Sequence, residues 1–304
     1  MPRPTEPVPT PTAQQALPRF DPREMNGRSF DFSREVAVMA VINRTPDSFY
    51  DQGATFALDA SVAAARRAIA DGADWVDIGG AKFAPGPPVP ISEEIDRVVP
   101  VVAALQGSGA VISVDTFHPE VARASIAAGA HVINDTTGVH DPRMAEVVAA
   151  SDATLVITHS LAAPRMPYPS PRYTDVVAEV AEFLRERVER AVSHGVPRDR
   201  IVIDPGHDLN KNTLHSLEIT RRLGEITEIG LPVLVAVSNK DFVGETLDRD
   251  RGERVEGSLA AVVACILQGA RIVRMHNVRQ AVDAVHMTEA ILGWRAPAYL
   301  RHNQ

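Results

Sequence analysis

Several residue classes are scarce in this chain of 304 residues, and each shortage excludes something. There is a single cysteine, Cys265, which excludes a framework of internal disulfide bridges. It lies in an apolar stretch with helical periodicity, so we expect a buried thiol. No apolar run is long enough to cross a bilayer, so we expect no membrane partner. The N-terminus lacks the apolar centre of a signal peptide, and we expect a cytoplasmic protein.

Basic residues are also too few for a general nucleic-acid-binding protein. The chain carries 31 lysines and arginines against 39 aspartates and glutamates, a formal net charge of -8. Binding to a phosphate backbone requires a basic face, so we expect no nucleic-acid partner. A local cationic pocket for a small anionic molecule remains open.

Residues 1–30 differ in composition from the rest of the chain. They contain few apolar side chains and seven prolines, at positions 2, 4, 7, 9, 11, 18 and 22. This composition predicts a disordered extension. We therefore expect one folded domain over residues 31–304.

The remainder of the chain alternates between short apolar runs and segments with helical periodicity. The expected strands are 35–42, 75–78, 111–114, 132–133, 154–157, 201–203, 232–237 and 271–273. The expected helices are 58–71, 92–105, 119–129, 142–150, 174–194, 213–226, 254–268 and 279–292. The runs are apolar on both faces, as in a parallel sheet covered by helices. Eight such units favour an α/β fold of the (β/α)8 TIM-barrel type.

A doubly wound open sheet is the alternative fold. That fold usually carries a glycine-rich phosphate turn after its first strand. Here the first strand is followed by residues 43–49 (Asn-Arg-Thr-Pro-Asp-Ser-Phe), which contain no glycine. The barrel is therefore the preferred interpretation.

Polar residues stand at the points where the expected strands end. They are Asn43, Asp77, Asp115, Asn134 with Asp135, Asp204, the triplet 238–240 (Ser-Asn-Lys) and the triplet 274–276 (Arg-Met-His). Each one alone has a second interpretation as a turn cap or a satisfied structural group. Their repetition at strand ends predicts one pocket ringed by the carboxyl ends of the strands.

The same segments carry a family resemblance. In order, they are 43–49, 77–80 (Asp-Ile-Gly-Gly) with 85–86 (Pro-Gly), 113–116 (Ser-Val-Asp-Thr), 133–135 (Ile-Asn-Asp), 204–206 (Asp-Pro-Gly), 211–212 (Lys-Asn), 238–240 and 274–276. Together they resemble dihydropteroate synthase over residues 36–292. That family joins a dihydropterin pyrophosphate to 4-aminobenzoate and releases pyrophosphate. The chain resembles a diverged, second-copy type of homologue.

The resemblance implies roles for seven residues. The pterin-binding positions are Asp115, Asn134, Asp204, Lys240 and Arg274, and the pyrophosphate-binding positions are Asn43, Arg274 and His276. Asp115, Lys240, Arg274 and His276 are the catalytic candidates. Asn43 is the candidate ligand for Mg²⁺, which prefers oxygen ligands and phosphates. The family also implies a homodimer formed through the late helices.

The departures from the family pattern cluster on the side of the second substrate. The positions concerned are Lys82, Phe83, Ala84, Leu209, Ser238 and Asn239. The family has Glu-Ser-Thr-Arg where this chain has 81–84 (Ala-Lys-Phe-Ala), and Ser-Arg-Lys at 238–240. It has Gly-Phe-Gly where this chain has Asp208, Leu209 and Asn210. Two arginines are lost and one acid is gained, which predicts a poorer site for a carboxylate.

Four functions follow from this pattern. The first is a dihydropteroate synthase homologue that keeps the pterin half of the site and has weak or no synthase activity. The second is an active synthase in which Lys82 and Arg44 compensate for the lost arginines. The third is a transferase that uses a different amine or leaving group, and the fourth is a noncatalytic pterin-binding or assembly protein. The related methyltetrahydrofolate methyltransferases are disfavoured by residues 45–49 and 238–240.

Overall fold

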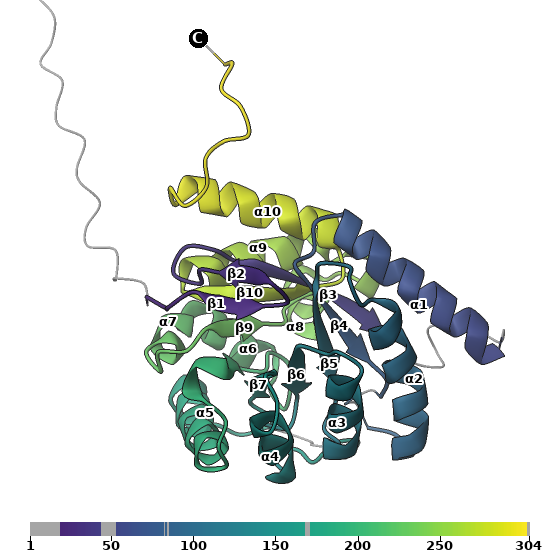
Figure 1. Ribbon diagram of the computed structural model, residues 1–304. Helices are drawn as coiled ribbons and strands as arrows, with labels where there is room; N and C mark the ends of the chain where they lie inside the picture. The colour runs from purple at the N-terminus through teal and green to yellow at the C-terminus, as the bar shows by residue number, and fades with distance from the viewer. Residues whose placement is uncertain (1–18, 44–52, 82, 84, 168–170, 303–304) are drawn as a thin grey trace, which may run out of the picture.

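Eight parallel strands close into a barrel, as the sequence predicts (Figure 1). The computed structural model describes residues 19–43, 53–81, 83, 85–167 and 171–302, without the side chains of 53–57. The barrel strands are β3 (Ala37–Asn43), β4 (Trp75–Gly79), β5 (Val111–Asp115), β6 (Val132–Asp135), β7 (Thr154–Thr158), β8 (Ile201–Asp204), β9 (Val233–Val235) and β10 (Ala270–Met275). Strand β10 pairs with both β9 and β3, which closes the barrel.

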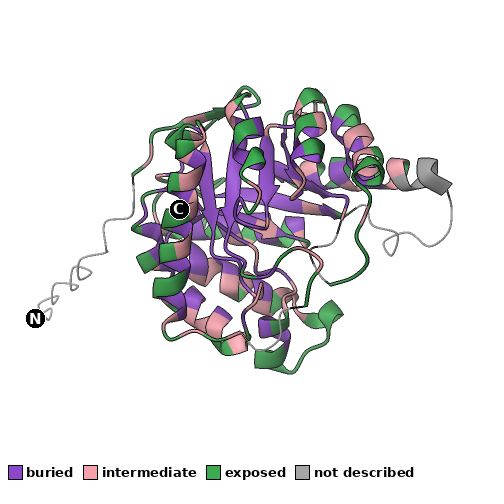
Figure 2. Ribbon diagram, turned by 90° about the horizontal axis from the view of Figure 1, so that it is seen from below, coloured by how far each residue is buried: buried purple, intermediate pink, exposed green. Residues whose placement is uncertain are grey.

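The helices surround the barrel and bury their inner faces against the strands (Figure 2). They are α1 (Gly53–Ala70), α2 (Ile91–Ala104), α3 (Pro119–Ala127), α4 (Arg143–Ala149), α5 (Val176–Ser193), α6 (Thr213–Arg221), α7 (Leu223–Thr227), α8 (Asp241–Leu247), α9 (Val255–Leu267) and α10 (Val278–Ile291). Short 3-10 helices occupy η2 (Arg198–Arg200) and η3 (Arg251–Glu253). Cys265 is fully buried on α9, as predicted. None of the described helices has the length and apolar character needed to span a membrane.

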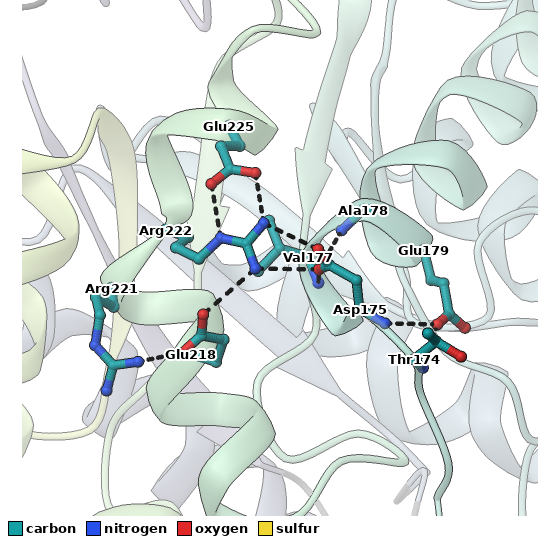
Figure 3. Close-up of polar contacts among 9 residues, drawn as sticks. All are labelled: Thr174, Asp175, Val177, Ala178, Glu179, Glu218, Arg221, Arg222 and Glu225. Atoms are coloured by element: carbon teal, nitrogen blue, oxygen red, sulfur yellow. Dashed lines mark hydrogen bonds and ion pairs between the residues drawn. The ribbon is translucent and has the colours of Figure 1, made fainter.

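The helix expected over residues 213–226 is divided at Arg222. Its backbone (φ -111°, ψ 24°) leaves the helical region and separates α6 from α7. The Arg222 guanidinium donates to Asp175, Glu218 and Glu225 (Figure 3). Asp175 also caps α5 by accepting from two backbone N–H groups. This cluster joins the start of α5 to the α6–α7 junction.

The described part of the expected disordered extension, from residue 19 to residue 30, contains a hairpin. Strands β1 (Arg23–Met25) and β2 (Arg28–Phe30) pair antiparallel around Asn26 and Gly27, whose φ angles are both positive. An Asn-Gly pair is the preferred loop of such a hairpin. Met25 and Phe30 are buried, and the Phe30 ring lies 6.0 Å from that of Trp75. These apolar contacts order a segment whose proline content suggested disorder; residues 1–18 lie outside the described part.

Side chains inside the barrel form stacked layers. One layer is apolar and packs on the hairpin; it contains Met39, Trp75, Val111, Val132, Val156, Val202, Leu234 and Ile272. Because side chains alternate along a strand, residues two positions later also point inward. Those residues include Asp77, Ser113, Asn134, Thr158, Asp204 and Arg274. The barrel interior therefore changes from apolar to polar toward the carboxyl ends of the strands.

Candidate functional site

Asp77 is the centre of the polar layer. It is fully buried on β4, and its Oδ1 accepts a hydrogen bond from the Ser113 hydroxyl at 2.6 Å. Its Oδ2 accepts from Asn134 Nδ2 at 3.1 Å and from Arg274 Nε at 2.6 Å. A buried carboxylate requires such partners. Four strands are thereby joined through one side chain.

Arg274 also binds the carboxylate of Asp115. Its Nη2 donates to Asp115 Oδ2 at 3.1 Å. Burial raises the pKa of Asp115, although the neighbouring guanidinium opposes the rise. Burial works against the charge of Arg274, but Asp77 and Asp115 outweigh it, so the pKa of Arg274 is raised. Arg274 stays charged between two carboxylates at the floor of the barrel mouth.

Three neighbouring strands present hydrogen-bond acceptors with spare capacity. The buried Asn134 Oδ1 and Thr158 Oγ1 have no hydrogen-bond partner among the described residues. Within the described part of the chain, Asp204 Oδ1 accepts only from the Gly206 N–H, at 2.7 Å. Burial raises the pKa of Asp204 to about 6, while Gly206 and Lys240 oppose the rise. Orphaned buried polar atoms are rare in folded proteins, so this row suits a ligand that carries N–H donors.

Two lysines lie beside this row. Lys240 lines the cavity, and burial lowers the pKa of its ammonium. Lys211 Nζ contacts three acceptors, His159 Nδ1 at 2.8 Å and the carbonyls of Gly206 and Leu209 at 2.9 Å. Burial lowers the pKa of Lys211 to about 7. His159 accepts through Nδ1, in agreement with burial and Lys211 lowering its pKa to about 2.

His276 is held by Ser238. The Ser238 hydroxyl lies 3.1 Å from both the backbone nitrogen and Nδ1 of His276. Burial lowers the pKa of His276 to about 4, so the ring is neutral at pH 7. In the tautomer whose Nδ1 accepts from the hydroxyl, Nε2–H remains as a donor. Ser238 therefore orients the ring of His276. The sequence did not indicate this role.

A cavity of about 710 Å³ opens above this layer at the carboxyl ends of the strands. Asn43, Asp115, Lys240, Arg274 and His276 line it. Asn134 and Asp204 are 3% and 4% exposed and lie within the barrel at the same end. The structure thus gathers all seven residues expected for the pterin and pyrophosphate positions.

The pattern that defines a family described as "Pterin binding enzyme" matches residues 39–276. This chain belongs to the pterin-binding enzyme family. It is 46% identical over 267 residues to the Mycobacterium tuberculosis protein named "Inactive dihydropteroate synthase 2", covering 86% of this chain and 84% of that one. It is 38% identical over 268 residues to the dihydropteroate synthase of Escherichia coli, covering 88% and 95%.

A solved structure agrees with this assignment. The dihydropteroate synthase of Xanthomonas albilineans with 4-aminobenzoic acid is 39% identical, with a TM-score of 0.82. The match covers 91% of this chain and 98% of that one. The chain is therefore a diverged member of the dihydropteroate synthase group within the family.

The residues that depart from the family pattern fall into three groups. Phe83 and Leu209 line the cavity. Asn239 is oriented toward Asn277, with Nδ2 3.5 Å from its Oδ1, and is absent from the cavity lining. Lys82, Ala84 and Arg44 lie outside the described residues. Of the expected second-substrate set, Ser238 and Asn239 thus contact His276 and Asn277 in the loop after β10.

Asp208, the acid gained relative to the family pattern, forms hydrogen bonds within the fold. Its Oδ2 accepts from the backbone N–H groups of Asp241 (2.6 Å) and Phe242 (3.3 Å), the first residues of α8. Its Oδ1 accepts from the Ser216 hydroxyl at 2.9 Å. The carboxylate therefore caps a helix, a short one absent from the sequence expectation.

Asn210 makes a second connection between loops. Its Oδ1 accepts from the Ser160 hydroxyl and from the N–H groups of Leu161 and Ala162, all within 2.9 Å. Asp208 and Asn210 have φ angles of 63° and 53°. Asp and Asn tolerate this left-handed region better than other residues with a side chain. They can thus replace the two family glycines and add bonds between loops.

Sequence reasoning missed several residues that shape the site. Asp77 was noted as a strand end but was given no role, and Thr158 was given none either. Glu94 on α2 was not considered; it is fully buried and accepts from the Thr116 hydroxyl at 2.6 Å. Its second oxygen lies 2.7 Å from His118 Nδ1. The inward alternation of the strands could have identified Asp77 and Thr158, but no local pattern indicates Glu94.

Proposed function

We propose that this protein binds a pterin with its pyrophosphate at the barrel mouth and has weak or absent dihydropteroate synthase activity. The observation that supports pterin binding is the row of acceptors formed by Asn134, Thr158 and Asp204. A pterin edge presents several N–H donors side by side, and a carboxylate beside an amide oxygen can accept them. Lys240 supplies a donor for the ring acceptors. Arg274, with its plane held by Asp77 and Asp115, supplies positive charge over the same floor.

The pyrophosphate side is supplied by Arg274, His276 and Asn43. Guanidinium groups recognise phosphate oxygens through paired hydrogen bonds, and the neutral His276 offers Nε2–H. Asn43 ends β3 at the cavity and offers one amide oxygen. This fits Mg²⁺, which takes few protein ligands when phosphates and water complete its shell. When bound, Mg²⁺ would neutralise charge on the leaving pyrophosphate.

Weak or absent synthase activity is inferred from the other half of the cavity and from the relatives. The cavity wall carries Phe83 and Leu209, and neither can form a charged contact with 4-aminobenzoate. Each lost charge-assisted contact costs about 1.5–3 kcal/mol. The M. tuberculosis relative, at 46% identity, is named as inactive. An active synthase and a transferase for a different amine are the alternatives that the experiment must separate.

We further propose a cytoplasmic homodimer. The late helices expose apolar side chains, with Leu267 on α9 and Met287 and Ile291 on α10 at 51%, 62% and 70% exposure. Neighbouring exposed apolar groups of this size are typical of interfaces. Light scattering measures the mass directly, and a monomer at all concentrations would contradict the proposal.

The test combines binding with turnover. Calorimetry with 6-hydroxymethylpterin and pyrophosphate, with and without Mg²⁺, measures occupancy of the pterin half. Dihydropteroate formation is then assayed with dihydropterin pyrophosphate and 4-aminobenzoate. Binding without product supports the proposal. Turnover at ordinary enzyme rates would establish the active synthase instead, and absence of binding would contradict both.

Thr158→Val provides a matched variant. It removes a hydroxyl that has no partner among the residues the structure describes, so stability is retained while pterin affinity falls by about 1 kcal/mol if the hydroxyl meets the ligand. Thr154→Val, at the opposite end of the same strand, is the control. Equal affinities for the two variants would place the ligand elsewhere.

A further inference from the structure

The half of the cavity formed by the loops after β4, β7 and β8 contains several apolar side chains. Phe83, Pro85, Met166, Pro171 and Leu209 line it. They come from three loops, those that follow β4, β7 and β8. Such a set resembles the lining of a pocket for an uncharged group.

These three loops are bound to one another. The Arg165 N–H donates to the Phe83 carbonyl at 3.2 Å, and the Gly86 N–H donates to the Arg165 carbonyl at 3.3 Å. The Arg165 guanidinium donates to the Pro87 carbonyl at 2.9 Å. Asn210 joins the loops after β7 and β8 through three hydrogen bonds. The apolar walls are thus preformed, which lowers the cost of binding a rigid group.

The charges around this half offer little to a carboxylate. Lys211 already meets three acceptors. The Arg251 side chain is 82% exposed and lies 3.9 Å from Asp241. Two carboxylates, Asp208 and Asp241, line the same cavity. An exposed guanidinium that shares its charge with an acid contributes little to binding.

We propose that this compartment takes an uncharged aromatic group, such as an aromatic amine without a carboxylate, beside the bound pterin. The proposal rests on the proposed pterin site and names the class of its neighbouring ligand. Among the described residues, a carboxylate placed there would lose its water and meet only the exposed Arg251 and the already bonded Lys211, apart from the Lys240 and Arg274 assigned to the pterin. An apolar ring would instead cover Phe83, Met166 and Leu209.

The experiment compares two ligands of the same shape. The full chain is saturated with 6-hydroxymethylpterin and pyrophosphate, then titrated with 4-methylaniline or with 4-aminobenzoate. We expect 4-methylaniline to bind about tenfold more tightly or better, the difference made by an unpartnered carboxylate. Equal affinities, a preference for 4-aminobenzoate, or no binding of 4-methylaniline would overturn the inference. Failure of the pterin to bind is a separate result that refutes the proposed function, and the inference with it.

Two variants locate the compartment. Met166→Arg adds a cation to a wall residue that is 60% exposed, so folding is retained. We expect 4-aminobenzoate affinity to rise roughly threefold to fivefold, as one exposed charge pair allows. Met287→Arg is the control, at 62% exposure on α10. Equal effects of the two substitutions would place the carboxylate site elsewhere. Loss of 4-aminobenzoate binding specifically in Lys82→Met would show that Lys82 supplies a cation for the carboxylate, and would overturn the inference.

Discussion

Asp208 offers the sharpest test of how the rebuilt half of the site is held. Its carboxylate accepts two N–H groups at the start of α8 and one hydroxyl from Ser216. Asp208→Gly restores the family residue and suits the φ of 63°, but it removes all three bonds. Loss of a helix cap costs about 1 kcal/mol and loss of a further hydrogen bond about the same. Glycine also removes the strain of the left-handed backbone, and this offsets part of the lost stability.

We therefore expect Asp208→Gly to lower the free energy of unfolding by about 1–2 kcal/mol. Asp208→Ala should cost roughly 1 kcal/mol more, because alanine is strained at this φ. Asp208→Asn keeps one acceptor oxygen and tolerates the backbone, so it should cost least. Pterin affinity should fall in the same order, because α8 begins directly after Lys240.

Urea unfolding and calorimetry measure this series. In a domain of this size each kcal/mol corresponds to a shift of roughly 2–4 °C in Tm. Asp248→Gly is the matched control, since Asp248 is exposed, has a φ of 53° and forms no side-chain hydrogen bond with a described residue. The reasoning is refuted if Asp208→Gly is as stable as the parent, or if Asp248→Gly loses as much.

Three further outcomes are expected. Pterin affinity should fall about tenfold per pH unit below pH 6, because the pKa of Asp204 is raised to about 6 and only its ionised form accepts two N–H donors; calorimetry between pH 5 and 7.5 should find no such slope in Asp204→Asn. Asp77→Asn should lower the free energy of unfolding by roughly 3 kcal/mol, since it removes a fully buried charge partner of Arg274, whose own side chain is 17% exposed; urea titration that finds no loss contradicts the assigned pairing. Phe83→Thr with Ala84→Arg should raise dihydropteroate formation above that of the parent, and an unchanged rate in the product assay counts against the loop explanation.

Much of the fold could be predicted because the pattern is repeated. Each barrel strand lies within two or three residues of its expected position, since apolar runs between helical segments leave few alternatives. The hairpin was missed although Asn26-Gly27 is a strong turn pair, because the surrounding prolines dominated the composition. Helix α8 was missed for a different reason. Its cap is Asp208, 33 residues away in sequence, and no local pattern contains that bond.

The site residues were predicted by type and place, but their pairings were not. The inward direction of Asp77, Asn134 and Arg274 follows from strand alternation, whereas their shared hydrogen bonds depend on barrel closure. Asn239 shows that the family pattern can predict the wrong orientation for a side chain. The family pattern suggests a lost arginine facing the second substrate, but its φ is 56° and its amide is oriented toward Asn277. An arginine restored there would be strained by about 1 kcal/mol, so residue type alone would not restore a contact.

The two halves of the cavity draw on different parts of the fold, and this explains how one changes without the other. The pterin half is built on strands, where Asp77 joins β4, β5, β6 and β10 in a buried layer. A substitution there leaves a buried charge without its partner. The second half is built on loops, whose side chains change without disturbing that layer. Asp208 and Asn210 then fix the altered loops in place. Recovery of a 4-aminobenzoate site therefore requires new charged groups and also a loop arrangement that presents them.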